Sequence, residues 1–184
     1  MRIFPGLLTA ACLVATPLAA DEITDTLNSA LAAYEAGDIQ YALDEIDIAR
    51  QQLLGRKTGA LSAFLPPAPE GWTREIDEEA APGLAMIGGG VGAEASYAGE
   101  GKRFAIKLMA DNPMVASLAG VINNAAMMGL TVERVNRQKF AIQDGEIMGL
   151  VANRILVQVS GADTETMLAT LEKMDFKAMQ GFGQ

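Results

Sequence analysis

The 184-residue sequence contains no histidine, a single cysteine and only 5% aromatic residues. The missing histidine excludes Ser-His-Asp and Cys-His nucleophile chemistry, histidine general bases and metal sites built on imidazole. Basic residues are also few, because 14 Lys and Arg face 23 Asp and Glu. The net charge of -9 argues against partners that are bound by phosphate neutralisation, so we expect no nucleic-acid binding. Half of the residues are apolar, which is ample for a packed core.

The first twenty residues have the pattern of a secretory signal peptide. Arg2 gives a positive start, an apolar run extends from Ile3 to Val14, and small residues lead up to Ala20. We expect cleavage after Ala20 and export to the bacterial periplasm. Cys12 would be removed with this segment, so the mature chain would have neither a thiol nor a disulfide. A lipoprotein cleavage site at Cys12 is the alternative interpretation.

One mature segment approaches the length of a membrane span. Residues 112–132 carry no charge over 21 positions, and about 20 apolar residues cross a bilayer. Pro113 and the adjacent Asn123 and Asn124 would be costly in hydrocarbon. We therefore expect a buried helix here and no integral membrane segment in the mature chain.

The apolar pattern of residues 21–55 predicts a helical hairpin. Ile23, Leu27, Ala30, Leu31 and Tyr34 recur at helical spacing before Gly37 and Asp38, and a second apolar stripe continues from Ile39 to Leu53. Gly37 supplies the left-handed residue that ends the first helix. Small side chains would let the two helices approach closely, namely Ala33, Ala36, Ala42 and Ala49.

The run from Ala33 to Ala42, with Ala49 seven residues later, resembles one tetratricopeptide-type repeat within residues 23–54. The resemblance implies a surface that binds peptides or proteins, and Tyr34 and Tyr41 are its candidate binding residues. No second copy follows, although such repeats normally need about three units to bury a continuous core. The other interpretation is a hairpin that packs on the domain behind it.

Residues 56–70 predict a linker. Gly55 and Gly59 are expected to end the second helix, and three prolines between residues 66 and 69 prevent it from resuming. Trp72 follows the linker directly and is expected to anchor the edge of a sheet against a helix. Ligand stacking is the alternative role for this indole.

The remainder, residues 71–184, predicts an α+β domain. Apolar residues alternate with period two in several short strands, and turn residues separate them. Runs of strands predict a mainly antiparallel sheet, and we expect two helices to cover one face of it. The expected strands are 71–76, 84–87, 91–97, 104–108, 130–135, 139–143, 146–151 and 155–160, and the expected helices are 113–128 and 163–173.

No catalytic motif accompanies this fold, so we expect no enzyme, no cofactor and no metal site. The glycine run at residues 88–92 lacks a lysine and a following helix, and therefore indicates a turn rather than a phosphate loop. The acidic runs at residues 44–47 and 75–79 are typical of solvated faces. A distant pair of catalytic carboxylates stays open, as does copper binding by thioethers, since nine of the ten methionines follow residue 20.

The uncharged segment 113–128 predicts a helix that is covered on both sides. Asn123, Asn124 and Met127 on its weakly polar side are candidate binding residues. Together with the hairpin, this segment favours a non-catalytic envelope accessory protein whose partner is another envelope protein. The alternative is a small-ligand or lipid-binding module with a pocket between the sheet and this helix.

Overall fold

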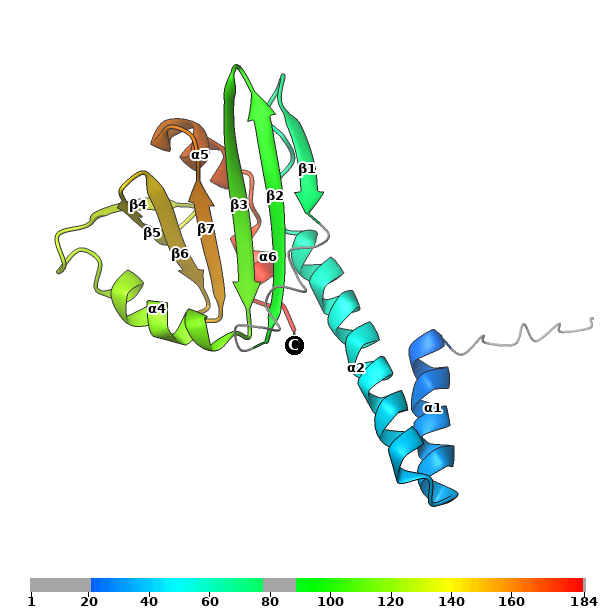
Figure 1. The fold of residues 1–184 in the computed structure, drawn as a ribbon. Helices are drawn as coiled ribbons and strands as arrows, with labels where there is room; N and C mark the ends of the chain where they lie inside the picture. Colours follow the sequence, from blue (N-terminus) through cyan, green and yellow to red (C-terminus); the bar gives the residue numbers. More distant parts are fainter. Residues whose placement is uncertain (1–20, 78–88, 184) are drawn as a thin grey trace, which may run out of the picture. The chain divides into compact units, whose positions relative to one another are not determined.

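The computed structural model describes residues 21–77 and 89–183. The signal-peptide pattern, the expected strand at 84–87 and Gly88 lie outside these residues. The chain divides into two compact units after Arg50 (Figure 1). The elements are α1 (Glu22–Glu35), α2 (Ile39–Ser62), β1 (Thr73–Asp77), β2 (Val91–Gly99), β3 (Lys102–Ala110), α4 (Pro113–Asn123), β4 (Thr131–Val135), β5 (Gln138–Gln143), β6 (Glu146–Val151), β7 (Ile155–Ser160), α5 (Thr164–Leu171) and α6 (Phe176–Met179).

The predicted helical hairpin is confirmed. The Asp21 carboxylate caps α1 by accepting from the Thr24 N–H at 3.0 Å. Gly37 adopts φ +83°, its N–H donates to the Tyr34 carbonyl, and the next N–H, of Asp38, donates to the Ala33 carbonyl. These two bonds close α1 with a Schellman motif. The side chain of Asp38 then caps α2, so the chain reverses within three residues.

Helix α2 is longer than predicted. The expected end at Gly55 is wrong, because the helix continues through Gly55 and Gly59 as far as Ser62. Leu61 is fully buried and Leu54 packs against the same apolar cluster of the sheet unit. Tertiary packing of these leucines outweighs the low helix propensity of two glycines, about 1 kcal/mol each. The first part of the predicted linker is therefore helical.

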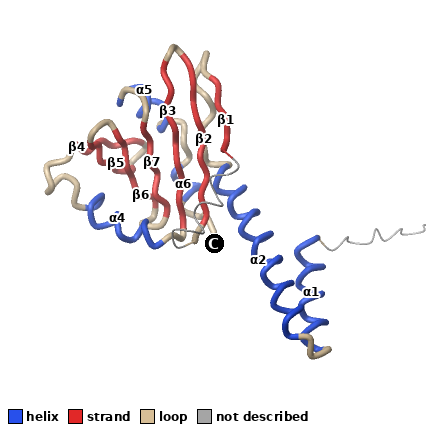
Figure 2. Tube along the Cα trace, viewed as in Figure 1, coloured by secondary structure: helices blue, strands red, loops and turns tan. Residues whose placement is uncertain are grey.

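Seven strands form one sheet in the order β1-β2-β3-β7-β6-β5-β4, as the strands in Figure 2 show. Every neighbouring pair in it is antiparallel. Short turns with left-handed residues join β2 to β3, β4 to β5, β5 to β6 and β6 to β7. The α+β class and the antiparallel sheet are thus confirmed.

The two faces of the sheet carry separate apolar clusters. Val157 and Val159 belong to the larger cluster, together with Met167 and Leu171 of α5. Leu156 belongs to the smaller one, which contains residues of α4. Successive residues of a strand point to opposite faces, so α4 and α5 cover different faces. The expectation that both helices cover one face is wrong.

Two further differences from the prediction concern helices. Helix α4 ends at Asn123 rather than near residue 128, and Asn124 is its C-cap residue. The short helix α6 was not expected from the sequence; the Asp175 side chain caps it by accepting from the Ala178 N–H at 2.9 Å. None of the helices in the described ranges combines length and apolarity in the degree that a membrane span requires.

Candidate functional site

Large apolar side chains lie exposed on both helices of the hairpin unit. Six of them form two stripes with the spacing i, i+4, i+7, and we call these six residues the hairpin surface. Their exposed fractions range from 47% to 65%. The members are Leu27, Leu31 and Tyr34 on α1, and Ile39, Leu43 and Ile46 on α2.

The hairpin leaves these side chains exposed because its own contact is made mostly by alanine. Ala30 and Ala33 of α1 and Ala42 of α2 are buried. Alanine brings helices close together but covers little neighbouring surface. The apolar arc of each helix is wider than this narrow contact, so the larger residues beside the alanines are left uncovered.

Both stripes lie on the same side of the hairpin. Successive residues of a helix are rotated by 100° about its axis. On each of the two helices, the exposed stripe lies in the same rotational direction from the buried alanines. The tight turn at Gly37 makes the helices antiparallel neighbours, and Figure 1 shows them side by side. A two-fold rotation relates two antiparallel helices, so equal rotational offsets place both stripes on one side.

The two candidate tyrosines do not lie together. Tyr34 is 65% exposed and belongs to the hairpin surface. Tyr41 is also exposed, but it lies about 160° around α2 from Leu43 by helical geometry. It therefore shares the other side of the hairpin with Ile48. Neither side of the hairpin contains both tyrosines.

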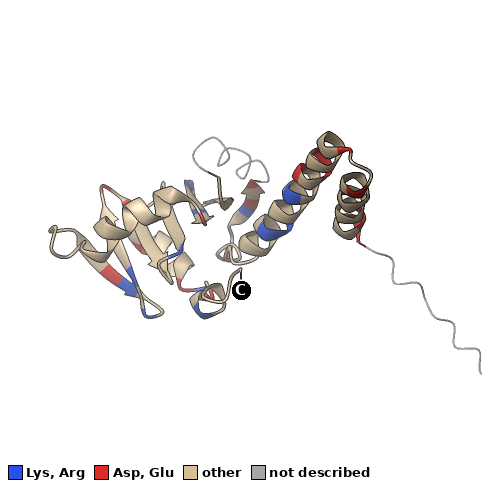
Figure 3. Cartoon of the chain, turned by 90° about the horizontal axis from the view of Figure 1, so that it is seen from below, with Lys and Arg blue, Asp and Glu red and all other residues tan. Residues whose placement is uncertain are grey.

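The hairpin is strongly acidic. Residues 21–50 contain eight Asp or Glu and a single basic residue, Arg50, whereas residues 51–184 contain 15 acidic and 12 basic residues. Figure 3 shows acidic positions on both helices. Glu35 follows Leu31 by four residues and Asp47 follows Leu43 by four, so one carboxylate borders each apolar stripe. The electrostatic field of this unit is negative beside its apolar side chains.

The other four candidate residues lie in the second unit. Trp72 packs against Phe104 of β3 with ring centroids 5.5 Å apart. The side-chain amide of Asn124 donates to the Gly120 carbonyl at 2.7 Å and so caps α4. Asn123 makes a long 3.5 Å contact with Asn153. Met127 is 88% exposed in the turns after α4.

The contact between α4 and the sheet is an apolar cluster. Val115 and Ile122 of α4 are buried there against Leu150 and Leu156 of the sheet, and further apolar side chains pack around them. Apolar side chains of the helix and the sheet meet at this contact, beside which a ligand pocket was the alternative prediction. The amide groups of Asn123 and Asn124 are exposed and lie outside this cluster.

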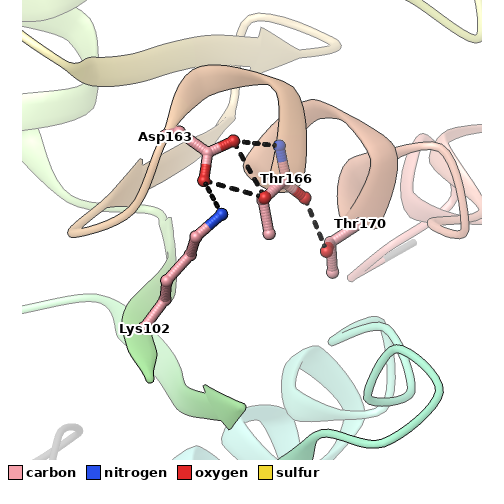
Figure 4. Close-up of polar contacts among 4 residues, drawn as sticks. All are labelled: Lys102, Asp163, Thr166 and Thr170. Carbon is pink, nitrogen blue, oxygen red and sulfur yellow. Dashed lines mark hydrogen bonds and ion pairs between the residues drawn. The ribbon is translucent and has the colours of Figure 1, made fainter. Parts of the chain in front are cut away.

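The best-connected polar cluster stabilises the start of α5 (Figure 4). Asp163 accepts from the Thr166 N–H at 2.9 Å, from the Thr166 hydroxyl at 2.8 Å and from Lys102 Nζ at 2.8 Å. The bond from Lys102, followed by those from Thr166, holds the pKa of Asp163 well below its usual range. Every oxygen of this carboxylate is engaged, so the cluster is a helix cap and ion pair. Within residues 21–77 and 89–183, no group of three His, Cys, Asp or Glu residues is arranged to hold a metal ion.

Comparison of the chain with protein-family models, curated proteins and solved structures finds no match. The helical hairpin is a feature of the structure, while the tetratricopeptide resemblance rests on residues 23–54 alone.

Proposed function

We propose that the protein is a non-catalytic envelope protein that binds another protein through its helical hairpin. The observation that carries the proposal is the hairpin surface, where six large apolar side chains are 47–65% exposed on one side of two short helices. Clustered exposed apolar residues in soluble proteins mark sites of interaction.

Three features of the sequence support this role. The first twenty residues have the pattern of an export signal, which would deliver the chain to the envelope. The absence of histidine removes the commonest general base and metal ligand. The likeness to a tetratricopeptide-type unit points in the same direction, because arrays of such hairpins bind peptides and proteins.

Photo-crosslinking in the native host tests the proposal with the full chain. A photoreactive amino acid replaces Tyr34 in one strain and Met128 in another, because Met128 is 60% exposed in the other unit. We expect Tyr34 to give an adduct with a defined partner that mass spectrometry identifies, and Met128 not to give it. Identical adducts from both positions would contradict the proposal.

Substitution of the hairpin surface then decides whether the adduct is specific. Leu31→Asp with Leu43→Asp should abolish the adduct at Tyr34, because both changes place charges within the apolar stripes. The matched control, Met114→Asp with Met128→Asp, changes two exposed apolar residues outside the hairpin and should leave the adduct intact. Circular dichroism checks that all variants keep their helix content.

A further inference from the structure

Resting on the proposed function, we infer that the partner presents a basic amphipathic helix, which lies along the hairpin surface with its apolar side between the two stripes. Lysine or arginine residues beside that apolar side face the carboxylates of the hairpin. A second copy of this chain and a membrane are the two other occupants that such a surface could take.

The form of the surface fits a helix. Leu27 and Tyr34 lie seven residues apart, and so do Ile39 and Ile46, which gives each stripe a length of about 10 Å at 1.5 Å per residue. A partner helix reaches over this length with anchors at i, i+3 or i+4, and i+7. The backbone groups within α1 and α2 are paired along each helix, so an extended peptide finds no strand edge to join. A third helix instead completes a three-helix bundle.

The charge of the surface selects a basic partner. Eight acidic residues and one basic residue give residues 21–50 a net charge of -7, whereas residues 51–184 carry only -3. Glu35 and Asp47 border the two stripes. Charges at the rim of an apolar patch govern which partner approaches and how fast it associates. The one basic residue of this segment, Arg50, offsets only one of its eight negative charges.

The same charge disfavours the other two occupants. Two copies of the hairpin would bring two units of charge -7 together, and like charges that face each other across an interface oppose association. A membrane surface rich in anionic lipid attracts basic segments and repels this acidic one. The exposed side chains of Leu31 and Leu43 are equally accessible to a second copy, to a bilayer and to a basic helix. Charge is therefore the property that distinguishes these three occupants.

We expect the complex to be transient and sensitive to salt. A standard interface buries about 800 Å² per partner with 20–30 residues a side, and the hairpin surface has only six residues. Its affinity should therefore lie in the micromolar range, on the order of 1–100 μM. Raising the ionic strength from about 0.05 M to about 0.5 M should weaken binding, because salt screens exposed charges.

Two synthetic helices test the inference against the purified full chain. Both peptides carry the same leucine stripe at i, i+3, i+4 and i+7, one with lysine and the other with glutamate at the flanking positions. Fluorescence anisotropy measures binding at low and high salt. We expect the lysine peptide to bind at least about tenfold more tightly at low salt, and most of this preference to vanish at high salt.

Charge reversal provides the matched variants. Glu35→Lys and Asp47→Lys change the two carboxylates that border the hairpin surface and should abolish the preference for the lysine peptide. Glu133→Lys and Glu172→Lys change the net charge equally at exposed positions of the other unit and should leave the preference unchanged. Retention of the lysine preference by the first variant would overturn the inference.

The remaining outcomes separate this inference from the proposed function. If both peptides bound equally and Leu31→Asp abolished this binding, the inference of a basic partner would be overturned. The hairpin would still be a protein-binding surface. A concentration-dependent dimer in analytical ultracentrifugation would make a second copy the occupant. Co-sedimentation with phosphatidylglycerol vesicles would make it a membrane. Binding of neither peptide would overturn the inference, while the crosslinking experiment decides on the proposed function by itself.

Discussion

The indole of Trp72 lies directly on Gly99, so closely that a Cβ on residue 99 would collide with three atoms of the ring. The same indole meets the ring of Phe104 at 5.5 Å, and Phe104 stacks on Tyr97 with ring centroids 4.7 Å apart. The three aromatic side chains therefore form a row of contacts, in which Phe104 lies between Trp72 and Tyr97. Gly99 is the position that lets Trp72 enter this group.

The first prediction concerns this contact. Gly99→Ala should lower the free energy of unfolding by about 1–3 kcal/mol, because the added methyl forces Trp72 out of its position. Gly120→Ala is the control, since open space surrounds Gly120 within α4, and it should raise the free energy of unfolding by about 0.5–1 kcal/mol. Urea unfolding followed by tryptophan fluorescence measures both. Equal effects of the two substitutions would contradict the packing of Trp72 on Gly99.

The second prediction concerns the continuity of α2. Gly55 and Gly59 lie inside the helix, and a Cβ at either position would meet no other atom within 4 Å. Each substitution by alanine should therefore stabilise the protein by about 0.5–1 kcal/mol. If the helix ended at Gly55, a Cβ there would instead cause strain and Gly55→Ala would destabilise the chain. Thermal unfolding by circular dichroism distinguishes the two results.

The third prediction concerns Tyr97. Its hydroxyl donates to the Pro66 carbonyl at 2.8 Å, and burial raises the pKa of Tyr97 to about 12, although Arg74 opposes the shift. A difference titration of tyrosinate absorbance between the wild type and Tyr97→Phe should place the ionisation near pH 12. Since the folded pKa lies above the usual value of about 10, the contribution to stability is complete below pH 10 and is lost as the pH rises toward the folded pKa. Ionisation near pH 10 in the folded protein would contradict the burial of this group.

The fourth prediction concerns the ion pair between Lys102 and Asp163. The pKa of Asp163 is lowered chiefly by the bond from Lys102, so this carboxylate stabilises the fold above its usual pKa of about 4. Asp163→Asn should lower the unfolding temperature at neutral pH. The difference from the wild type should shrink below about pH 4, as protonation removes the charge from the wild-type carboxylate. Glu165→Gln, a change of an exposed acid in the same first turn, is the control and should lower the unfolding temperature less at neutral pH.

The hairpins of the sheet are the part of the fold that sequence predicts best. Asp144 and Gly145 both adopt left-handed conformations, with φ 51° and 80°, and an Asp-Gly pair is typical of the tight turn between β5 and β6. The alternating apolar residues on either side determine the register, because a shift by one residue would turn the buried side chains to the opposite face.

The helix ends were harder to predict because they depend on distant contacts. Gly55 reads locally as a helix end, yet the burial of Leu61 in the core of the sheet unit carries the helix past it. Gly129 suggests the end of α4, yet the side chain of Asn124 caps that helix earlier. In both cases the helix ends at a residue other than the glycine that a local rule favours.

The candidate site was predictable as a segment but not as a surface. Ile23 and Leu31 belong to the same apolar pattern on α1, but the first is 6% exposed and the second 56%. The pattern gives the width of the apolar arc, while the size of the facing residues decides how much of it is covered. Because the facing residues are alanines, Leu31 and Leu43 join Tyr34 in the candidate site, although the sequence alone singled out only the two tyrosines within the hairpin.

The order of the strands also bears on aggregation. Within the described sheet, β1 and β4 are the outermost strands, and both are rich in charge, with Arg74, Glu75 and Asp77 on β1 and Glu133 and Arg134 on β4. Charged residues on outer strands discourage the addition of a strand from another molecule. The exposed apolar residues of the hairpin lie on helices, which offer no template for fibril growth. The proposed binding surface of the hairpin can therefore stay exposed at high concentration while the charged outer strands oppose edge-to-edge pairing of sheets from separate molecules.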